Sequence, residues 1–194
     1  MTTISDHWQL DGGWLSGARR VASPNCNPRP AGTSPELIVV HGISLPPGQF
    51  GGANIEALFT NTLDPGGHPY FAEIAHLEVS AHFLIQRTGE MVQFVSTDER
   101  AWHAGVSSWC GREQCNDFSI GVELEGTDDT RYEDLQYNAL LTLIAVLRNH
   151  YSSIHADAIV GHSDIAPGRK TDPGQSFDWH ELQTRLGVEL LPRS

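Results

Sequence analysis

Two histidines in this sequence come directly after short apolar runs. ELIVVH ends at His41, and AIVGH ends at His162. Each run has the length and composition of a strand buried on both faces, and a side chain at a strand end can face a cleft from a rigid scaffold. Neutral imidazole nitrogen is a good zinc ligand, and a catalytic zinc has three protein ligands and one open position. The two histidines therefore indicate a zinc site that needs one further ligand.

The loop that begins at the second histidine, GHSDIAPGRKTDPG (residues 161–174), offers a third ligand and a cation. Its glycines and prolines exclude a regular helix or a central strand. Asp164 and Asp172 are both candidates for the third ligand, and their spacing does not decide between them. Lys170 is the only lysine in the chain, beside eleven arginines. Such a lone lysine suggests a point charge that stabilises an oxyanion.

A further apolar run, FSIGVELEG (residues 118–126), carries two candidate bases. Strand alternation places its large apolar residues on one face, and Glu123 and Glu125 on the other. A carboxylate beside a zinc-bound water can take a proton from that water and pass it to a leaving amine. Either glutamate fits this role, and a solvated strand face is the competing interpretation.

The remaining patterns predict the elements that position these groups. Apolar spacing and capping residues indicate helices, and alternation around a glycine turn indicates a hairpin. Because a hairpin interrupts the alternation of strands and helices, we expect one α+β domain over residues 1–194, with a central mixed sheet flanked by helices. We expect a loose segment over 1–12, an irregular arm over 22–35, a helix over 54–63 and a hairpin over 79–95 that turns at Thr88-Gly89. A capping box at 130–133 should open a second helix, with apolar positions at Leu140, Leu143, Ile144, Leu147 and Tyr151. A last helix is expected over 179–186, capped by Asp178.

Composition excludes several classes of protein. The net charge of −12 and the absence of a basic run argue against nucleic-acid binding. No apolar run is long enough to span a membrane, and the first residues lack the pattern of a secretory signal, so we expect a cytoplasmic protein. An odd count of three cysteines favours free thiols, and the C-x4-C spacing of Cys110 and Cys115 is a weak metal signal.

Five strings resemble the AmpD-type N-acetylmuramyl-L-alanine amidases: VVHGISLPPGQFGG, SAHFLI, RAWHAG, NDFSIGVELEGTD and GHSDIAPGRKTDPG. The resemblance runs from about residue 13 to residue 179, and it extends more distantly to phage lysozyme amidases and animal peptidoglycan recognition proteins. It implies the mixed-sheet fold of that superfamily. It also implies a cytoplasmic zinc enzyme of peptidoglycan recycling, which cuts the bond between the lactyl group of 1,6-anhydromuramic acid and L-alanine.

The resemblance also implies residue roles. It makes His41, His162 and Asp172 the zinc ligands, Glu123 rather than Glu125 the general base, and Lys170 the stabiliser of the oxyanion. The sequence departs from the family pattern at Gly42, where Asn commonly follows the first histidine, and at Ser163, where Cys is often found.

Substrate-binding residues are expected in the loop before the glutamates. An acidic protein that holds a peptide with carboxylates needs a cation in its cleft, and we assign this role to Arg112. We expect Trp102 and His103 to contact the sugar. The partner is then a small muropeptide, with no nucleic acid, membrane or obligate protein partner. Two alternatives remain: a muropeptide-binding module without catalysis, which would lack a metal ligand, and a zinc hydrolase that acts on another amide.

Overall fold

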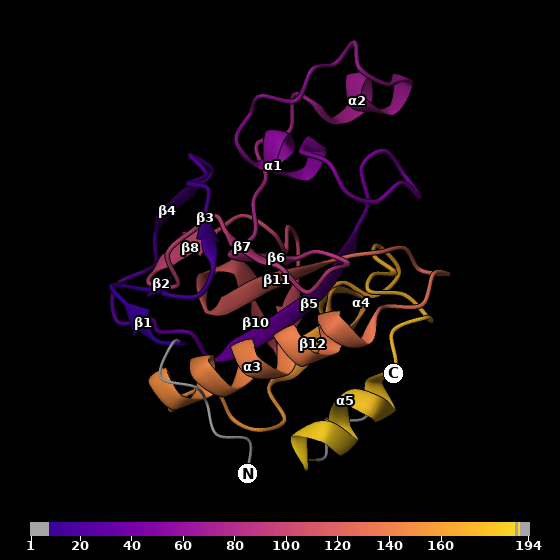
Figure 1. Cartoon of the computed structure of the whole chain (residues 1–194). Helices are drawn as coiled ribbons and strands as arrows, with labels where there is room; N and C mark the ends of the chain where they lie inside the picture. Colours follow the sequence, from indigo (N-terminus) through magenta and orange to yellow (C-terminus); the bar gives the residue numbers. More distant parts are fainter. Residues whose placement is uncertain (1–7, 189, 191–194) are drawn as a thin grey trace.

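A six-stranded mixed sheet forms the centre of the computed structural model, which describes residues 8–188 and 190 (Figure 1). The first four strands in spatial order are parallel, the fourth and fifth are antiparallel, and the last is parallel to the fifth. The mixed sheet expected from the sequence is thus confirmed. In spatial order the strands are β12 (Ile159–Gly161), β5 (Leu37–Ile43), β11 (Ser119–Glu125), β6 (Phe83–Ile85), β7 (Met91–Gln93) and β3 (Arg19–Arg20).

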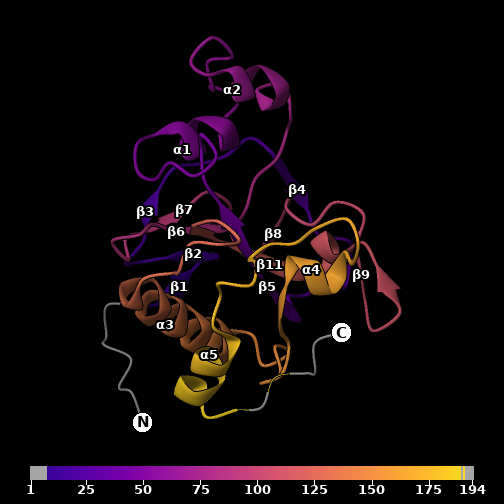
Figure 2. The ribbon, with the colours of Figure 1, turned by 90° about the vertical axis from the view of Figure 1, so that its right-hand side faces the viewer.

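Helices cover both faces of this sheet (Figures 1 and 2). Helix α3 (Asp134–His150) packs along one face, with α5 (Trp179–Leu186) beside it. Helices α1 (Asn54–Phe59) and α2 (Pro69–Ile74) lie on the other side, in a lobe above the sheet. The apolar stripe expected on α3 faces the core, where four of its five residues are fully buried: Leu140, Leu143, Ile144 and Leu147. Burial of this stripe fixes α3 against β11 and β6.

The helix ends agree with the predictions for α5 and differ for α3. Asp178 caps α5, since its carboxylate accepts a hydrogen bond from the Glu181 N–H at 2.8 Å. Helix α3 begins three residues later than its expected capping box. The Gln136 side chain accepts from the Glu133 N–H at 3.0 Å, whereas Thr130 is bonded to Thr127 in the preceding turn.

Other expectations need correction. The hairpin turns at Gly89 as predicted, with φ of 83°, but its first strand begins only at Phe83. Helix α2 was not predicted; Pro69 opens it, and His68 caps it by accepting from the Tyr70 N–H at 3.1 Å. The arm over 22–35 is partly regular, because β4 (Cys26–Pro28) pairs with β8 (Glu99–Ala101).

The expected loose segment, residues 1–12, is described only from residue 8. There β1 (Leu10–Asp11) pairs with β2 (Trp14–Leu15), so this part belongs to the fold. The short elements left are β9 (Ser108–Trp109), β10 (Arg112–Glu113), the 3-10 helix η1 (Cys115–Asp117) and α4 (His162–Ile165).

Two expectations from composition can be compared with the structure. Cys26, Cys110 and Cys115 are free thiols, as expected. Over residues 8–188 and 190, no helix has the length and apolar character that crossing a membrane requires.

Candidate active site

Three neighbouring parallel strands bring the candidate site together at their carboxyl ends. His41 is the fifth residue of β5, and in the parallel register it lies opposite Glu123 of β11. His162 follows β12 directly as the first residue of α4. In open sheets of this kind, ligands bind outside the carboxyl ends of the strands. The order β12-β5-β11 therefore makes neighbours of residues that are far apart in the sequence.

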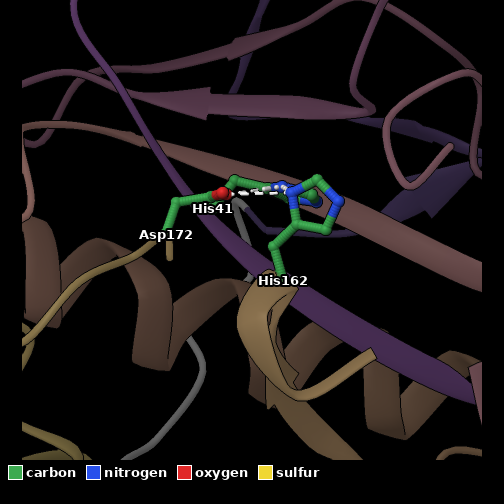
Figure 3. Close-up of side chains that lie close together, drawn as sticks. All are labelled: His41, His162 and Asp172. Atoms are coloured by element: carbon green, nitrogen blue, oxygen red, sulfur yellow. Dashed lines mark hydrogen bonds and ion pairs between the residues drawn. The ribbon is translucent and has the colours of Figure 1, made fainter. Parts of the chain in front are cut away.

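His41, His162 and Asp172 point at one another across a small triangle (Figure 3). The Nδ1 atoms of His41 and His162 are 3.0 Å apart, and Asp172 Oδ2 is 3.1 Å from the first and 3.0 Å from the second. Three such donors suit a small ion bonded to each at about 2.0–2.2 Å. It is the one group of three or more metal-ligating side chains found among the described residues, and its donor set is that of a catalytic zinc site.

The structure distinguishes the two aspartates that the sequence left open. Asp164 Oδ2 accepts a hydrogen bond from the Gly161 N–H at 2.6 Å, so this carboxylate caps α4. Two hydrogen bonds to the backbone hold Asp172 beside the histidines. Its carbonyl accepts from the Ser163 N–H at 3.0 Å, and the next carbonyl, of Pro173, accepts from the buried Tyr132 hydroxyl at 2.9 Å.

The charge states of this group favour a cation. Burial lowers the pKa of His41 to about 4, which leaves its ring neutral near pH 7. Burial alone would raise the pKa of Asp172, but hydrogen bonds with His162 and His41 outweigh it and hold this pKa well below its usual range. A neutral imidazole and a charged carboxylate are the protonation states that bind metal.

Glu123 and Glu125 lie on the same strand in different environments. The Oε2 atom of Glu123 is buried without a hydrogen-bond partner beside the metal-ligating group. Both oxygens of Glu125 are occupied: one accepts from the Gly51 N–H and the other from the Arg87 N–H at 3.2 Å. Burial, and then the negative charge of Asp172, raise the pKa of Glu123 well above its usual value. Of the two glutamates, Glu123 is the one with an unpartnered side-chain oxygen.

A cleft of about 460 Å³ opens over this group. Lys170 lines it and takes part in none of the ion pairs found among the described residues. Trp102 also lines it, and its indole N–H donates to Asn27 Oδ1 at 2.6 Å, which fixes the ring. Both residues were assigned from the sequence and both face the cleft. Tyr70 of α2, which was not predicted, also lines the cleft.

The other two expected substrate contacts are placed differently. Arg112 on β10 is absent from the lining of the cleft. Its guanidinium pairs with Glu36 at 3.0 Å and lies 3.9 Å from the centre of the Phe118 ring, so its position does not support a substrate contact. His103 does line the cleft, but both its ring nitrogens are bonded within the protein, to His41 and Ser119.

Tyr132 is a residue of the site that the sequence did not single out. Its ring and hydroxyl occupy the space beside two glycines: a Cβ at Gly42 would lie 2.4 Å from the hydroxyl, and a Cβ at Gly126 would lie 2.4 Å from the ring. Glycine at position 42, where the family commonly has Asn, therefore fits the packing of this tyrosine. The signal in the sequence was this pair of glycines at the ends of two strands, which leaves room for a large side chain.

Comparison with known proteins adds to this geometry. Residues 31–175 match the family described as N-acetylmuramoyl-L-alanine amidase. The chain is 59% identical over 180 residues to 1,6-anhydro-N-acetylmuramyl-L-alanine amidase AmpD of Escherichia coli K12, covering 93% of this chain and 98% of the relative.

Two solved structures are similar in fold and sequence. A crystal structure of a selenomethionine derivative of AmpD aligns with a TM-score of 0.89 and 60% identity, covering 93% of this chain and 99% of that one. AmpDh3 of Pseudomonas aeruginosa, solved in complex with anhydromuramic pentapeptide, aligns with a TM-score of 0.62 and 32% identity, covering 82% of this chain and 62% of that one.

Proposed function

Because the chain belongs to the N-acetylmuramoyl-L-alanine amidase family, we propose that it hydrolyses the amide bond between the lactyl group of 1,6-anhydro-N-acetylmuramic acid and L-alanine in muropeptides. The Escherichia coli relative bears the name of this activity, and AmpDh3 binds an anhydromuramic pentapeptide. The observation that carries the proposal is a triangle of metal-ligating atoms, with edges of 3.0–3.1 Å, beside a buried carboxylate oxygen that has no partner.

His41, His162 and Asp172 are the residues that would hold a zinc ion. Their donor atoms converge, and the protonation states of His41 and Asp172 are those of a metal site. Zinc bound there would supply Lewis-acid polarisation of the scissile carbonyl and make a water molecule more acidic. The rest of the chemistry belongs to side chains of the chain itself.

Glu123 takes a proton from the attacking water and gives it to the L-alanine amine as that amine leaves. A group that first accepts and then donates needs a pKa near the working pH, and burial moves the pKa of Glu123 upward from the usual carboxyl range. Lys170 supplies positive charge to the oxygen that becomes an anion in the tetrahedral state. Its exposed position on the cleft wall supports this role.

The indole of Trp102 is the surface against which the sugar packs. A fixed aromatic face beside the metal-ligating group suits the apolar face of a sugar ring, and the hydrogen bond to Asn27 holds that face in place. His103 also lines the cleft, and because its two ring nitrogens are bonded within the protein, the proposed contact with the sugar falls to its ring carbons.

The residues present here favour catalysis over one of the two alternative functions, a module that only binds. A module that only binds muropeptides would have no need of the three ligands together with Glu123 and Lys170. A zinc hydrolase that acts on another amide uses the same groups, so a panel of substrates separates it from an amidase. We further propose that the protein acts as one domain in the cytoplasm on small muropeptides, which cell fractionation tests.

The direct experiment incubates the purified, zinc-loaded protein with an anhydromuramyl tripeptide and analyses the products by mass spectrometry. We expect free tripeptide and anhydro-N-acetylmuramic acid. Cleavage between two amino acids, or loss of the acetyl group, would support another amidohydrolase instead. Elemental analysis should give one zinc per chain, and His162→Ala should lose it.

A further inference from the structure

We propose that His103 is a positioning residue that fixes the ring of His41 for metal binding, and that Ser119 anchors His103 in turn. This inference rests on the proposed function, because it assigns a task to residues beside the metal ligands. His103 was expected from the sequence to contact sugar. Its two ring nitrogens instead connect His41, at 2.9 Å, with the Ser119 hydroxyl, at 3.1 Å.

His162 shows which ring nitrogen of a ligating histidine carries the proton. Its Nε2 is 3.1 Å from the carbonyl oxygen of Ala104. A carbonyl can only accept, so Nε2 carries a proton, and Nδ1, which faces the triangle, is the nitrogen left to ligate an ion that takes the place of the hydrogen bond to Asp172. This is the arrangement by which proteins orient a metal-ligating histidine through its second nitrogen.

His41 needs the same tautomer, and its Nε2–H requires an acceptor. That acceptor is His103 Nδ1, and the two rings meet edge to face with their centres 5.0 Å apart. With Nδ1 accepting, His103 carries its own proton on Nε2 and donates it to Ser119 Oγ. The order of donors is therefore fixed from His41 through His103 to Ser119.

The backbone around His103 is built for this contact. A Cβ at Gly121 would lie 2.4 Å from the His103 ring, so only glycine there leaves room for it. Asn116 Oδ1 accepts from the N–H groups of both His103 and Ala104, at 3.1 and 2.8 Å. Asn116 thus holds a segment that supports both histidine ligands. The His103 side chain bonds to His41, and the Ala104 carbonyl bonds to His162.

Two substitutions of nearly equal shape test the hydrogen bond separately from the packing. His103→Asn keeps an acceptor where Nδ1 was, and His103→Leu does not. We would measure Zn²⁺ affinity by competition with a chromophoric chelator. His103→Leu should bind Zn²⁺ about 10–100-fold more weakly than the unmodified protein, the range found for loss of such supporting bonds, and His103→Asn should lose clearly less. The exposed His155→Leu is the matched control and should bind unchanged.

Equal losses for Asn and Leu, or no loss for Leu, would overturn the inference. If the unmodified protein bound no Zn²⁺, the proposed function would fail instead, which is a different result. Should His103→Leu not fold, NMR of the zinc-loaded, ¹⁵N-labelled unmodified protein still decides. A scalar coupling through the hydrogen bond between His41 Nε2 and His103 Nδ1 is expected, and a His41 proton on Nδ1 would refute the chain of donors.

Discussion

Glu123 and Glu125 are two positions apart on β11, yet only one of them has a side-chain oxygen without a partner. Both oxygens of Glu125 hold backbone N–H groups of neighbouring loops, whereas Glu123 keeps one buried oxygen unpartnered. Strand alternation puts the two side chains on one face, but it carries no information about which loops approach that face. The distinction came from the resemblance, and the contacts of Glu125 support it.

Glu123→Ala is therefore expected to bind zinc and substrate and to lose about 10²–10⁴ in kcat, the range for a lost general acid–base. Elemental analysis and steady-state kinetics check both parts. Glu125→Ala is the control: it should lose stability, because the backbone N–H groups of Gly51 and Arg87 lose their acceptor, while its folded fraction keeps a normal kcat. An inactive Glu125→Ala beside an active Glu123→Ala would reverse the assignment.

Lys170 is expected to affect both the rate and its pH dependence. Lys170→Met should lower kcat by about 10²–10³ with little change in KM, because the charge it stabilises forms mainly in the tetrahedral state. The charge of Lys170 lowers the pKa of Glu123, so removing it raises that pKa. The acid limb of the kcat profile should therefore move to higher pH. Lys170→Arg should rescue only in part, and a variant with wild-type rate would show that the lysine is dispensable.

At the scale of elements, the sequence predicted what is encoded locally. Buried runs gave the strands that end at His41 and His162, and the apolar stripe gave α3. What escaped prediction depends on contacts between distant segments. The choice of Asp172 over Asp164 depends on how the loop folds back. The role of His103 depends on its meeting Gly121 of β11.

The position of Arg112, which was expected in the cleft, also depends on contacts between distant segments. Arg112 precedes Glu123 in the chain, which suggested that it reaches the cleft. It lies instead on a two-stranded hairpin of β9 and β10, where Glu36 and Phe118 hold its guanidinium. Nearness in sequence to Glu123 therefore does not bring the Arg112 side chain into the cleft.

The contact of Tyr132 with the loop that carries Asp172 can also be tested at the scale of elements. Tyr132→Phe removes the hydroxyl that donates to the Pro173 carbonyl and leaves that buried acceptor unpaired. The free energy of unfolding should fall by about 1–3 kcal/mol, measured by urea denaturation. Zinc affinity should fall as well, because Asp172 precedes the released carbonyl. The partly exposed Tyr70→Phe should leave stability unchanged; equal stability of Tyr132→Phe would mean that the bond contributes nothing.

At the scale of the whole molecule, buried neutral histidines make stability depend on pH. Burial lowers the pKa of His82 to about 3 in the folded protein, from an ordinary value of 6.5. Below pH 6.5 the unfolded chain binds a proton that the folded protein does not, so the free energy of unfolding decreases as the pH falls toward 3. One such group contributes a slope of about 1.4 kcal/mol per pH unit.

Urea denaturation of the metal-free protein between pH 7 and pH 5 checks this expectation. His82→Gln should reduce the slope by about one proton, in addition to any uniform loss of stability. The exposed His155→Gln is the matched control for replacing a histidine by glutamine. An unaltered slope for His82→Gln would show that His82 takes up its proton in the folded protein.

The separation of the ligands along the chain has a consequence for folding. His41 and His162 are 121 positions apart, and they become neighbours only when β12 pairs with β5. Closing so long a loop has a high entropic cost that must be met before an ion can bridge its ends. We therefore expect the ion to bind after β12 has paired with β5. Zinc should slow unfolding far more than it speeds folding, and at a thousand times its Kd it should add about 4 kcal/mol to stability.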